Sequence, residues 1–502
     1  EISLGLVGSE MCIRDSLRTA ERLTNLGLSY LSLDRAGSTL SNGELQRVQI
    51  SRAVRSDTTG VLYVLDEPSI GLHPYNVDGL MKIVRELVDR KNSVVLVDHD
   101  PRILMDADQL IEIGPGAGKE GGRIVTQGTP LEAEKNPHSL IGPYLSGKES
   151  LKVRSRATEK DMFENGSIRI KTKPFYTVKA LDVSIPKGRM IAVTGVSGSG
   201  KTSLVIECLV PALQAVIQGT KLPEHVDSIE AKGIQSVKVI DSKPIGANVR
   251  STVATYDGVF DDLRKLFART ADAKAKGLTA GDFSYNTGKL RCPVCDGTGI
   301  ITMDVQFLPD VDTICPSCGG SRYGKDAYDI LWKSKEKDSV SVSLPGLLKL
   351  TVEEAAGILH EETKIAKQLK ILQDLGVCYL TLGEATPALS GGEAQRLKLA
   401  YEMETPQQGS VFVFDEPTIG LHPQDVKKLV LIFDHLIQLG ATVIVIEHDL
   451  ELVTNCDYII DMGPWGGTEG GRVVVEGTPE AVAATSESIT GRYLKQELAE
   501  DK

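Results

Sequence analysis

The sequence contains no run of 18 or more apolar residues, so it encodes no membrane-spanning helix. A charged segment followed by a short apolar one, as in a secretory signal, is also missing. Positive charge is not in excess either, because 56 Lys and Arg residues stand against 68 Asp and Glu residues, for a net charge of -12. This balance excludes a chain that is basic over its whole surface. An acidic protein can still bind nucleic acid through a local basic surface.

Cysteine is scarce and is not distributed as in a disulfide framework. Of the eight cysteines, four fall in two Cys-x-x-Cys pairs. The other four are scattered along the chain: Cys12, Cys208, Cys378 and Cys456. This pattern is typical of a cytoplasmic protein with one metal site.

An initial methionine is absent, and from the start at Glu1 we expect the chain to be a fragment. Residues 1–16 show no clear helical or strand periodicity and fit poorly with the amphipathic segment that follows them. We interpret residues 1–16 as foreign sequence and assign them no function.

The sequence contains an internal repeat. Three stretches recur with one offset of 349 positions: TLSNGELQR (39–47) as ALSGGEAQR (388–396), VLDEPSIGLHP (64–74) as VFDEPTIGLHP (413–423), and IGPGAGKEGGRIVTQGTP (113–130) as MGPWGGTEGGRVVVEGTP (462–479). A constant offset over this length indicates two copies of one folded unit without a net insertion.

Each copy has the pattern of alternating helices and strands. In the first copy we predict helices over 44–56 and 76–91, and strands over 61–66 and 93–98. The two strand segments are short apolar runs, which are typical of strands buried on both faces. The alternation predicts a parallel α/β sheet.

One segment has the pattern of a phosphate-binding loop. The apolar residues 189–194 predict a strand, GVSGSGKT (195–202) follows, and 203–213 predict a helix. This is the G-x-x-x-x-G-K-[ST] pattern between a strand and a helix, where the pattern is most specific. The alternative is a glycine-rich turn that merely starts a helix.

The residue types of this loop suit a nucleotide with Mg²⁺. Glycines let backbone N–H groups surround phosphates, the lysine reaches the β- and γ-phosphates, and the threonine hydroxyl suits Mg²⁺. The dipole at the start of the helix favours the bound anion. The predicted ATP and Mg²⁺ ligands of the loop are Gly195, Gly198, Ser199, Gly200, Lys201 and Thr202.

Acidic residues and a histidine follow two predicted strands. Asp415 is positioned to hold Mg²⁺, and Glu416 to polarise the attacking water. His448 would sense the γ-phosphate. The first copy repeats these residues as Asp66, Glu67 and His99, but no G-K-[ST] precedes them. A solvated acidic turn and a structural histidine are the alternatives.

Two cysteine pairs predict a zinc site. CPVC and CPSC are separated by 19 residues, a spacing at which four thiolates suit tetrahedral Zn²⁺. The predicted ligands are Cys292, Cys295, Cys315 and Cys318. A redox dithiol and unpaired structural cysteines remain as alternatives. With four protein ligands, the zinc site would be structural rather than catalytic.

These residues resemble ATP-binding cassette (ABC) ATPases, whose signature corresponds to LSNGE and LSGGE here. In that family the signature of one cassette caps ATP on the phosphate loop of the other. The resemblance implies one complete site from 195–202, Asp415, Glu416 and His448 with Ser41, Asn42, Gly43 and Glu44. It implies half of a second from Asp66, Glu67 and His99 with Ser390, Gly391, Gly392 and Glu393.

More specifically, residues 17–495 resemble the UvrA family, the ATP-binding component of the ABC excinuclease. The resemblance is carried by the DEP-S/T-IGLH and GP-x-x-G segments, RSTVATYDGVFDDLRKLFA (250–268), and the cysteine module with its FLPD (307–310). It implies a cytoplasmic, homodimeric ATPase that recognises damaged double-stranded DNA in nucleotide excision repair and loads a UvrB-type helicase partner. No nuclease site is visible, and no membrane association is implied.

The region between the two cassette motifs is relatively basic. Residues 232–340 carry 16 Lys and Arg against 14 Asp and Glu, whereas the whole chain has a net charge of -12. Candidate phosphate contacts are Lys243, Arg250, Arg264, Lys265, Lys289, Arg291 and Arg322. The resemblance singles out Lys243, Arg250 and Ser251 as DNA-facing. A solvated surface charge is the alternative for each basic residue.

Several positions depart from the family pattern. Ser242 replaces a glutamine, Asn42 a glycine, Leu45 an alanine and Asp98 a glutamate. These departures indicate a divergent paralogue. Such a paralogue would give resistance to DNA-intercalating drugs without recruiting the incision machinery, and it stands as the alternative to repair. The soluble ATPase of a transporter is disfavoured by the cysteine module.

The predicted fold class is α/β, with two ABC-type cassettes, the first truncated and the second with a zinc-binding, DNA-facing insertion. The predicted segments are 1–16 unassigned, 17–147 first cassette, 148–166 linker, 167–240 phosphate-loop lobe, 241–385 insertion, and 386–502 remainder of the second cassette.

Overall fold

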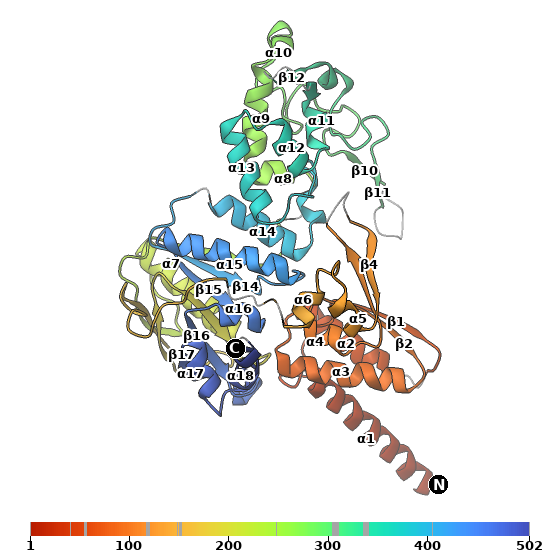
Figure 1. Cartoon of the computed structure of the whole chain (residues 1–502), viewed down its shortest axis with the longest axis vertical. Coiled ribbons are helices and arrows are strands. Elements are labelled where there is room, and N and C mark those ends of the chain that lie inside the picture. Colours follow the sequence, from red (N-terminus) through yellow and green to blue (C-terminus); the bar gives the residue numbers. More distant parts are fainter. Residues whose placement is uncertain are drawn as a thin grey trace. The chain divides into compact units, whose positions relative to one another are not determined.

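The computed structural model describes residues 2–40, 42–54, 58–116, 121–147, 149, 153–246, 248–303, 311–334, 341–403 and 405–500, without the side chains of 2–12, 42 and 500. The chain forms two compact units (Figure 1). Unit 1 comprises Glu1–Asp241 and Gln407–Lys502, and unit 2 comprises Ser242–Pro406. Within the described residues, no helix combines the length and hydrophobicity that a bilayer span requires.

The second repeat in unit 1 is built on a six-stranded sheet. Its order is β17 (Arg472–Gly477), β16 (Tyr458–Gly463), β7 (Met190–Thr194), β15 (Thr442–Ile446), β14 (Ser410–Asp415) and β9 (Ser236–Ile240). All neighbours are parallel except β16 and β17. Strands β7 and β15 are buried along their whole length, as their largely apolar sequences predict. The predicted parallel α/β sheet is confirmed.

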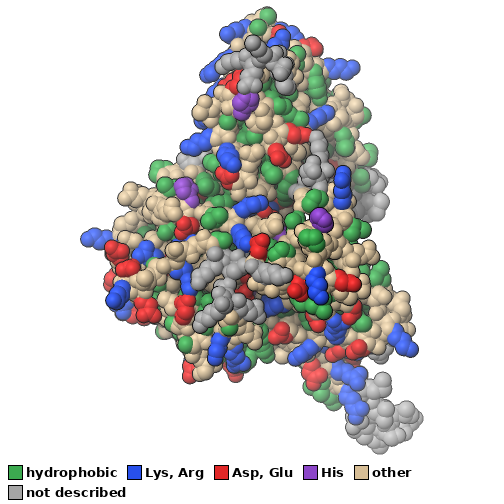
Figure 2. Space-filling view, in the orientation of Figure 1, with side chains coloured by type: hydrophobic (Ala, Val, Ile, Leu, Met, Phe, Trp, Pro, Cys, Tyr) green, Lys and Arg blue, Asp and Glu red, His purple; other side chains and the backbone are tan. Residues whose placement is uncertain are grey.

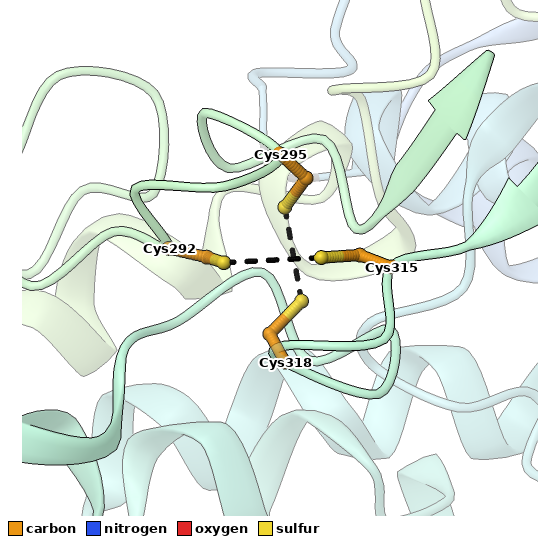
Figure 3. A group of neighbouring side chains, drawn as sticks. All are labelled: Cys292, Cys295, Cys315 and Cys318. Atoms are coloured by element: carbon orange, nitrogen blue, oxygen red, sulfur yellow. Dashed lines mark hydrogen bonds between the residues drawn. The ribbon is translucent and has the colours of Figure 1, made fainter. Parts of the chain in front are cut away.

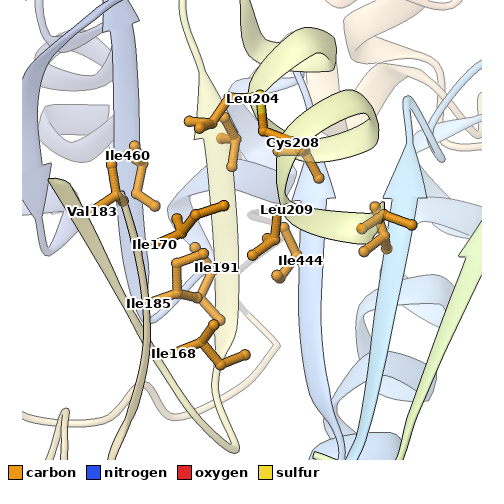
Figure 4. Close-up of a cluster of buried hydrophobic side chains, with 14 of the residues drawn as sticks. Ile168, Ile170, Val183, Ile185, Ile191, Leu204, Cys208, Leu209, Ile444 and Ile460 are labelled. Atoms are coloured by element: carbon orange, nitrogen blue, oxygen red, sulfur yellow. The ribbon is translucent and has the colours of Figure 1, made fainter. Parts of the chain in front are cut away.

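A second, antiparallel sheet packs near this one and consists of β6 (Asp182–Pro186), β5 (Ser167–Thr172) and β8 (Val226–Glu230). The hydrophobic core joins β5 and β6 to β7 and to the helix after the phosphate loop (Figure 4). That helix begins with a π-helical segment, η3 (Ser203–Leu209), and continues as α7 (Val210–Gln218). The remaining helical elements are α15 (Pro423–Gln438), α16 (Leu450–Thr454), η6 (Gly467–Glu469), α17 (Pro479–Ala484) and α18 (Ile489–Glu500).

The first repeat contributes fewer strands. Its strands form two pairs, a parallel one of β1 (Leu62–Asp66) and β2 (Ser93–Val97) and an antiparallel one of β3 (Leu110–Gly114) and β4 (Arg123–Gly128). Its helical elements are α1 (Ile2–Asn25), η1 (Gly37–Thr39), α2 (Asn42–Val54), α3 (Pro74–Asp89), α4 (Pro101–Met105), α5 (Pro130–Lys135) and α6 (Gly142–Leu145).

One prediction for the first repeat is wrong. Strands β1 and β2 are not buried on both faces, because Val64 is 64% and Val95 47% exposed. Within the described residues β1 pairs only with β2, whereas its counterpart β14 lies between β9 and β15. Residues 2–16 form the first part of α1, which continues to Asn25.

Unit 2 combines short helices with two β-hairpins, β10 (Ile300–Met303) with β11 (Val311–Ile314) and β12 (Leu331–Lys333) with β13 (Ser341–Ser343). Its helical elements are α8 (Val253–Tyr256), α9 (Val259–Ala268), α10 (Ala271–Ala275), η4 (Lys325–Asp329), α11 (Leu344–Leu348), α12 (Val352–Ile358), α13 (Thr363–Asp374), η5 (Thr386–Ala388) and α14 (Gly391–Met403). The sequence prediction assigned 386–406 to the cassette, but this segment groups with unit 2.

Candidate nucleotide site and metal centre

The phosphate loop follows β7 directly and needs its glycines. Gly195, Gly198 and Gly200 have φ angles of 127°, 76° and 100°, which side chains rarely adopt. A Cβ atom on Gly195 would lie 2.0 Å from the carbonyl oxygen of Met462, so no larger residue fits there. The loop therefore keeps its backbone open toward its interior, as a phosphate cradle requires.

Lys201 is folded into this loop. Its Nζ donates to the carbonyl oxygens of Gly195 (2.8 Å) and Val196 (3.0 Å). Burial lowers the pKa of Lys201, and the carboxylates of Glu416, Asp461 and Asp415 oppose that shift. The buried hydroxyls of Ser197 and Ser199 have no hydrogen-bond partner among the described residues. Two unsatisfied donors beside a buried ammonium suit an anion with several acceptor oxygens.

A glycine-rich segment of the second repeat holds the phosphate loop from outside. The N–H of Gly467 donates to Gly198 O (3.1 Å), and the N–H of Gly471 donates to Ser199 O (3.0 Å). Gly466 passes so closely that a Cβ atom there would lie 2.6 Å from Ser197 O. Sequence reasoning used this segment only as a family motif. Its glycine spacing, repeated in the first copy, was the signal for a structural role.

Asp415 ends β14, and Glu416 follows it in a left-handed conformation with φ 49°. The N–H of Glu416 donates to Ile446 O (2.9 Å), which fixes the turn against the neighbouring strand. Burial and the adjacent Asp415 raise the pKa of Glu416, while Lys201 opposes the shift. A non-glycine residue held at positive φ at a strand end is a feature of functional sites.

His448 completes this group. Its Nε2 lies 3.7 Å from Glu416 Oε1, and its Nδ1 is buried with no partner among the described residues. Burial and the charge of Lys201 lower its pKa well below the usual value, so the ring is neutral. Glu447 accepts from the N–H of His448 and from the N–H of Thr418 (3.0 Å). The structure thus brings Lys201, Asp415, Glu416 and His448 of the predicted site close to one another.

The corresponding residues of the first repeat are also adjacent. Glu67 has φ 45°, and its Oε1 lies 3.3 Å from Nε2 of His99. The hydrogen bond to Glu67 raises the pKa of His99, which is 40% exposed at its side chain. Asp98 accepts from the N–H of His99 (2.8 Å), as Glu447 does from His448. The departure from glutamate at Asp98 therefore preserves this contact.

Within unit 1, the first repeat reaches the phosphate loop of the second. A Cβ atom on Gly198 would lie 2.5 Å from the ring of Tyr30, whose hydroxyl donates to Glu44 Oε1 (2.6 Å). Arg47, on the same helix as Glu44, is 4% exposed, and its positive charge acts to lower the pKa of Glu416. Sequence reasoning missed Tyr30 and Arg47.

The structure describes the signature of the second repeat in full but only part of that of the first. Ser41 and the side chain of Asn42 lie outside the described residues, whereas Gly43 and Glu44 are described. In unit 2, Ser390 directly precedes α14, and Gly391, Gly392 and Glu393 form its start. Glu393 accepts from Ser390 N (2.7 Å), and Tyr379 donates to Glu393 (2.7 Å), as Tyr30 does to Glu44. These residues belong to unit 2, whereas Asp66, Glu67 and His99 belong to unit 1.

The four predicted zinc ligands converge (Figure 3). Their Sγ atoms all lie within 4.8 Å of one another, with Cys292 and Cys315 at 4.0 Å and Cys295 and Cys318 at 3.7 Å. Four sulfurs on a tetrahedral Zn²⁺, with bonds of about 2.3 Å, would be about 3.8 Å apart. The donor set and its spacing therefore fit Zn²⁺. The FLPD motif at 307–310 lies outside the described residues.

The zinc module contacts the segment that the resemblance assigned to DNA. Arg322 donates to Val249 O (2.8 Å) and lies over the ring of Tyr285, whose hydroxyl donates to Arg250 O (2.9 Å). Arg322 is only 6% exposed. The prediction that Arg322 contacts phosphate is therefore wrong, because its charge is buried in these contacts.

Several other candidate phosphate contacts carry acidic partners within unit 2. Arg250 and Arg291 lie 3.5 and 3.1 Å from Asp296, and Lys289 lies 3.3 Å from Asp282. Arg264 and Lys265 pair with Asp261 and Asp262. On the visible face in Figure 2, basic and acidic side chains are interspersed. Ser251 accepts from Thr386 N (2.9 Å) through its carbonyl oxygen, which leaves its hydroxyl uninvolved in that bond.

No family model matches the chain, but individual proteins do. UvrABC system protein A of Staphylococcus aureus (strain COL) is 44% identical over 486 residues, 96% of this chain and 50% of that protein. The same-named protein of Aquifex aeolicus (strain VF5) is 44% identical over 505 residues, covering 99% and 53%. The chain thus spans about half the length of the curated relatives it matches.

Solved structures give the same result. The crystal structure of UvrA2 from Deinococcus radiodurans matches with a TM-score of 0.87 and 39% identity, covering 95% of this chain and 57% of that one. A structure of RNase-L Inhibitor is 18% identical with a TM-score of 0.50, covering 96% and 71%, and shows a likeness of fold alone. These matches confirm the predicted fold class.

Proposed function

Because the chain belongs to the UvrA family of ABC ATPases, we propose that it hydrolyses ATP and couples this reaction to recognition of damaged double-stranded DNA in nucleotide excision repair. The observation that carries the proposal is the convergence of the phosphate loop, Glu416 and His448 with unsatisfied donors in the loop. We place this activity in the cytoplasm.

In the complete site, Lys201 and the hydroxyls of Ser197 and Ser199 bind the phosphates. Thr202 and Asp415 would hold Mg²⁺, and the bound ion would neutralise charge on the phosphate oxygens. Glu416 accepts the proton of the attacking water, and its raised pKa makes it a stronger base than an exposed glutamate. The neutral ring of His448 lies beside Glu416 and senses the γ-phosphate.

The first repeat completes this site from the other side. Glu44 and Gly43 would lie on the phosphate face of the nucleotide together with Ser41 and Asn42, and Tyr30 supports the loop at Gly198. A second site would use Asp66, Glu67 and His99 of the first repeat. That site would need a phosphate loop for the first repeat.

Duplex DNA would contact unit 2 around Lys243, Arg250 and Ser251. The zinc module holds this segment in place through Arg322 and Tyr285. Since no base-reading motif is evident, recognition would use the shape and deformability of DNA. We expect a homodimer that loads a UvrB-type helicase partner, and incision would belong to other proteins of the system.

A second candidate is a UvrA-like ATPase that protects DNA from intercalating drugs without recruiting incision. The departures at Asn42, Leu45 and Ser242 favour it, because they lie in the signature and in the segment before the DNA-facing region. The two candidates share the ATP site and differ in preference for damaged DNA.

Lys201→Ala tests the ATP site. It removes the ammonium from the loop, so we expect ATP hydrolysis to fall at least 100-fold, which is about 2.7 kcal/mol of transition-state stabilisation. Lys221→Ala, at an exposed position outside the loop, is the matched control and should hydrolyse ATP at the wild-type rate. Retained hydrolysis in Lys201→Ala would refute the assignment of this site.

A further inference from the structure

A chain of buried hydrogen bonds joins the two repeats at the start of the phosphate loop. Thr194, the last residue of β7, donates to Asp461 Oδ1 (2.9 Å), and Thr490 of α18 donates to the same oxygen (2.6 Å). The Thr490 hydroxyl lies 3.1 Å from Nε2 of His73, which belongs to the first repeat. All four side chains are at most 2% exposed.

The direction of these hydrogen bonds is fixed by the backbone. His73 caps α3, and its Nδ1 accepts from Tyr75 N (3.2 Å), so Nδ1 carries no proton. Burial lowers the pKa of His73 well below the usual value, and the neutral ring therefore carries its proton on Nε2. Nε2–H donates to Thr490, and Thr490 donates to Asp461. Every donor in the chain points toward the carboxylate of Asp461.

The same segment of the first repeat also approaches the catalytic group. The ring of His73 meets that of His448 edge-on, with centroids 5.9 Å apart. Two residues before it, Gly71 lies so close to Glu416 that a Cβ atom would be 2.9 Å from Oε2. Residues 71–73 therefore contact the site at Glu416 and His448 and, through Thr490 and Asp461, at Thr194.

Among the described residues, the first-repeat half-site has no matching chain of side-chain hydrogen bonds. The counterpart of His73 is His422, whose Nδ1 accepts from Gln424 N (3.2 Å) in the same capping role. At the position that corresponds to Thr490 the first repeat has Ile141, which offers no side-chain hydrogen-bonding group. Glu112, the counterpart of Asp461, accepts from the backbone N–H groups of Leu140 and Ile141 instead. His422 lies beside Tyr144.

We propose that His73 is a positioning residue for the complete ATP site, acting through Thr490 and Asp461 on the start of the phosphate loop and through ring contact on His448. This inference rests on the proposed ATPase function and adds a regulatory asymmetry to it. The position of the first repeat sets the geometry for hydrolysis at the complete site. Among the described residues, His422 has no matching chain of hydrogen bonds, although Gly420 approaches Glu67 as Gly71 approaches Glu416.

Two substitutions break the connection from opposite ends. His73→Asn keeps an N-cap acceptor for α3 but is too short to reach Thr490. Thr490→Val removes the hydroxyl at constant shape, and Thr490→Ser retains it. His422→Asn is the matched control, because it makes the same change at the repeat position that lacks the chain. Each variant of the full chain is assayed for kcat, KM and ATP affinity.

ATP affinity can be followed through Trp465, which lies in the glycine-rich segment beside the phosphate loop, once Trp332, the only other tryptophan, is replaced by phenylalanine. We expect His73→Asn and Thr490→Val each to lower kcat about fivefold, equivalent to about 1 kcal/mol. Binding of ATP should stay within about twofold of wild type, because the phosphate ligands are untouched.

The pair should also be non-additive, with the double variant no slower than either single variant, since both break one chain. Thr490→Ser should recover the wild-type kcat, and His422→Asn should leave it unchanged. Equal kcat values in His73→Asn and His422→Asn, or fully multiplicative effects in the double variant, would overturn the proposal. Failure of wild type itself to hydrolyse ATP would refute the proposed function instead.

Discussion

The pH dependence of ATP hydrolysis is the sharpest consequence of the site geometry. Burial and Asp415 raise the pKa of Glu416 from its ordinary value to about 7. The ionised form is the general base, so catalysis is present above this pKa and lost below it. With a pKa of about 7, roughly half of Glu416 is ionised at pH 7 and roughly a tenth at pH 6. We therefore expect kcat/KM for ATP to rise about tenfold per pH unit on the acidic side of 7.

The assay is steady-state hydrolysis at constant ionic strength between pH 5.5 and 8.5, since kcat/KM reports the free enzyme. Burial lowers the pKa of His448 and keeps its ring neutral, and burial lowers the pKa of Lys201 to about 8, so the limb below pH 7 is the one that reports Glu416. Glu416→Gln should abolish the pH-dependent rate. Arg47→Met should move the acidic limb to higher pH, because the Arg47 charge lowers the pKa of Glu416. Arg52→Met, exposed on the same helix, is the control. A kcat/KM that does not change with pH would contradict the assignment of Glu416 as the general base. An acidic limb at the same pH in Arg47→Met as in wild type would contradict it as well.

Two further predictions concern the loop and the zinc module. Gly195→Ala should weaken ATP binding more than tenfold, measured by Trp465 fluorescence, because its Cβ would collide with Met462 O. Gly219→Ala, also at positive φ but with no atom within 4 Å, should leave ATP affinity unchanged. Cys292→Ser should lower zinc from one ion per chain toward none and speed hydrogen exchange at 249–251, since Arg322 of the module holds Val249. Cys378→Ser, outside the cluster, should keep the zinc, and unchanged zinc in Cys292→Ser would contradict the ligand assignment.

Local patterns in the sequence were enough to predict the phosphate loop and the zinc ligands. In the phosphate loop, positions such as Gly195 need a particular residue type for local reasons of backbone conformation. The two cysteine pairs lie within 27 residues, from Cys292 to Cys318, so their spacing can be read directly from the sequence. Buried parallel strands such as β7 are almost entirely apolar, so they can be predicted without knowledge of their neighbours.

Features that depend on distant contacts could not be predicted. Tyr30 and His73 act at the phosphate loop only because the two repeats meet in unit 1, and no spacing rule links positions so far apart in sequence. The exposure of β1 follows from the absence of a second neighbouring strand among the described residues, not from its own sequence. The burial of Arg322 likewise depends on Tyr285 and Val249.

In the proposed function, ATP use serves recognition of damaged DNA. The most direct measurement compares binding of one duplex with and without a bulky adduct, at a fixed salt concentration and with and without ATP. We expect the protein to bind the adduct-bearing duplex more tightly than the unmodified one when ATP is present. In Lys201→Ala this dependence on ATP should be lost. Equal binding to the two duplexes at every nucleotide condition would contradict damage recognition and favour the drug-protection candidate.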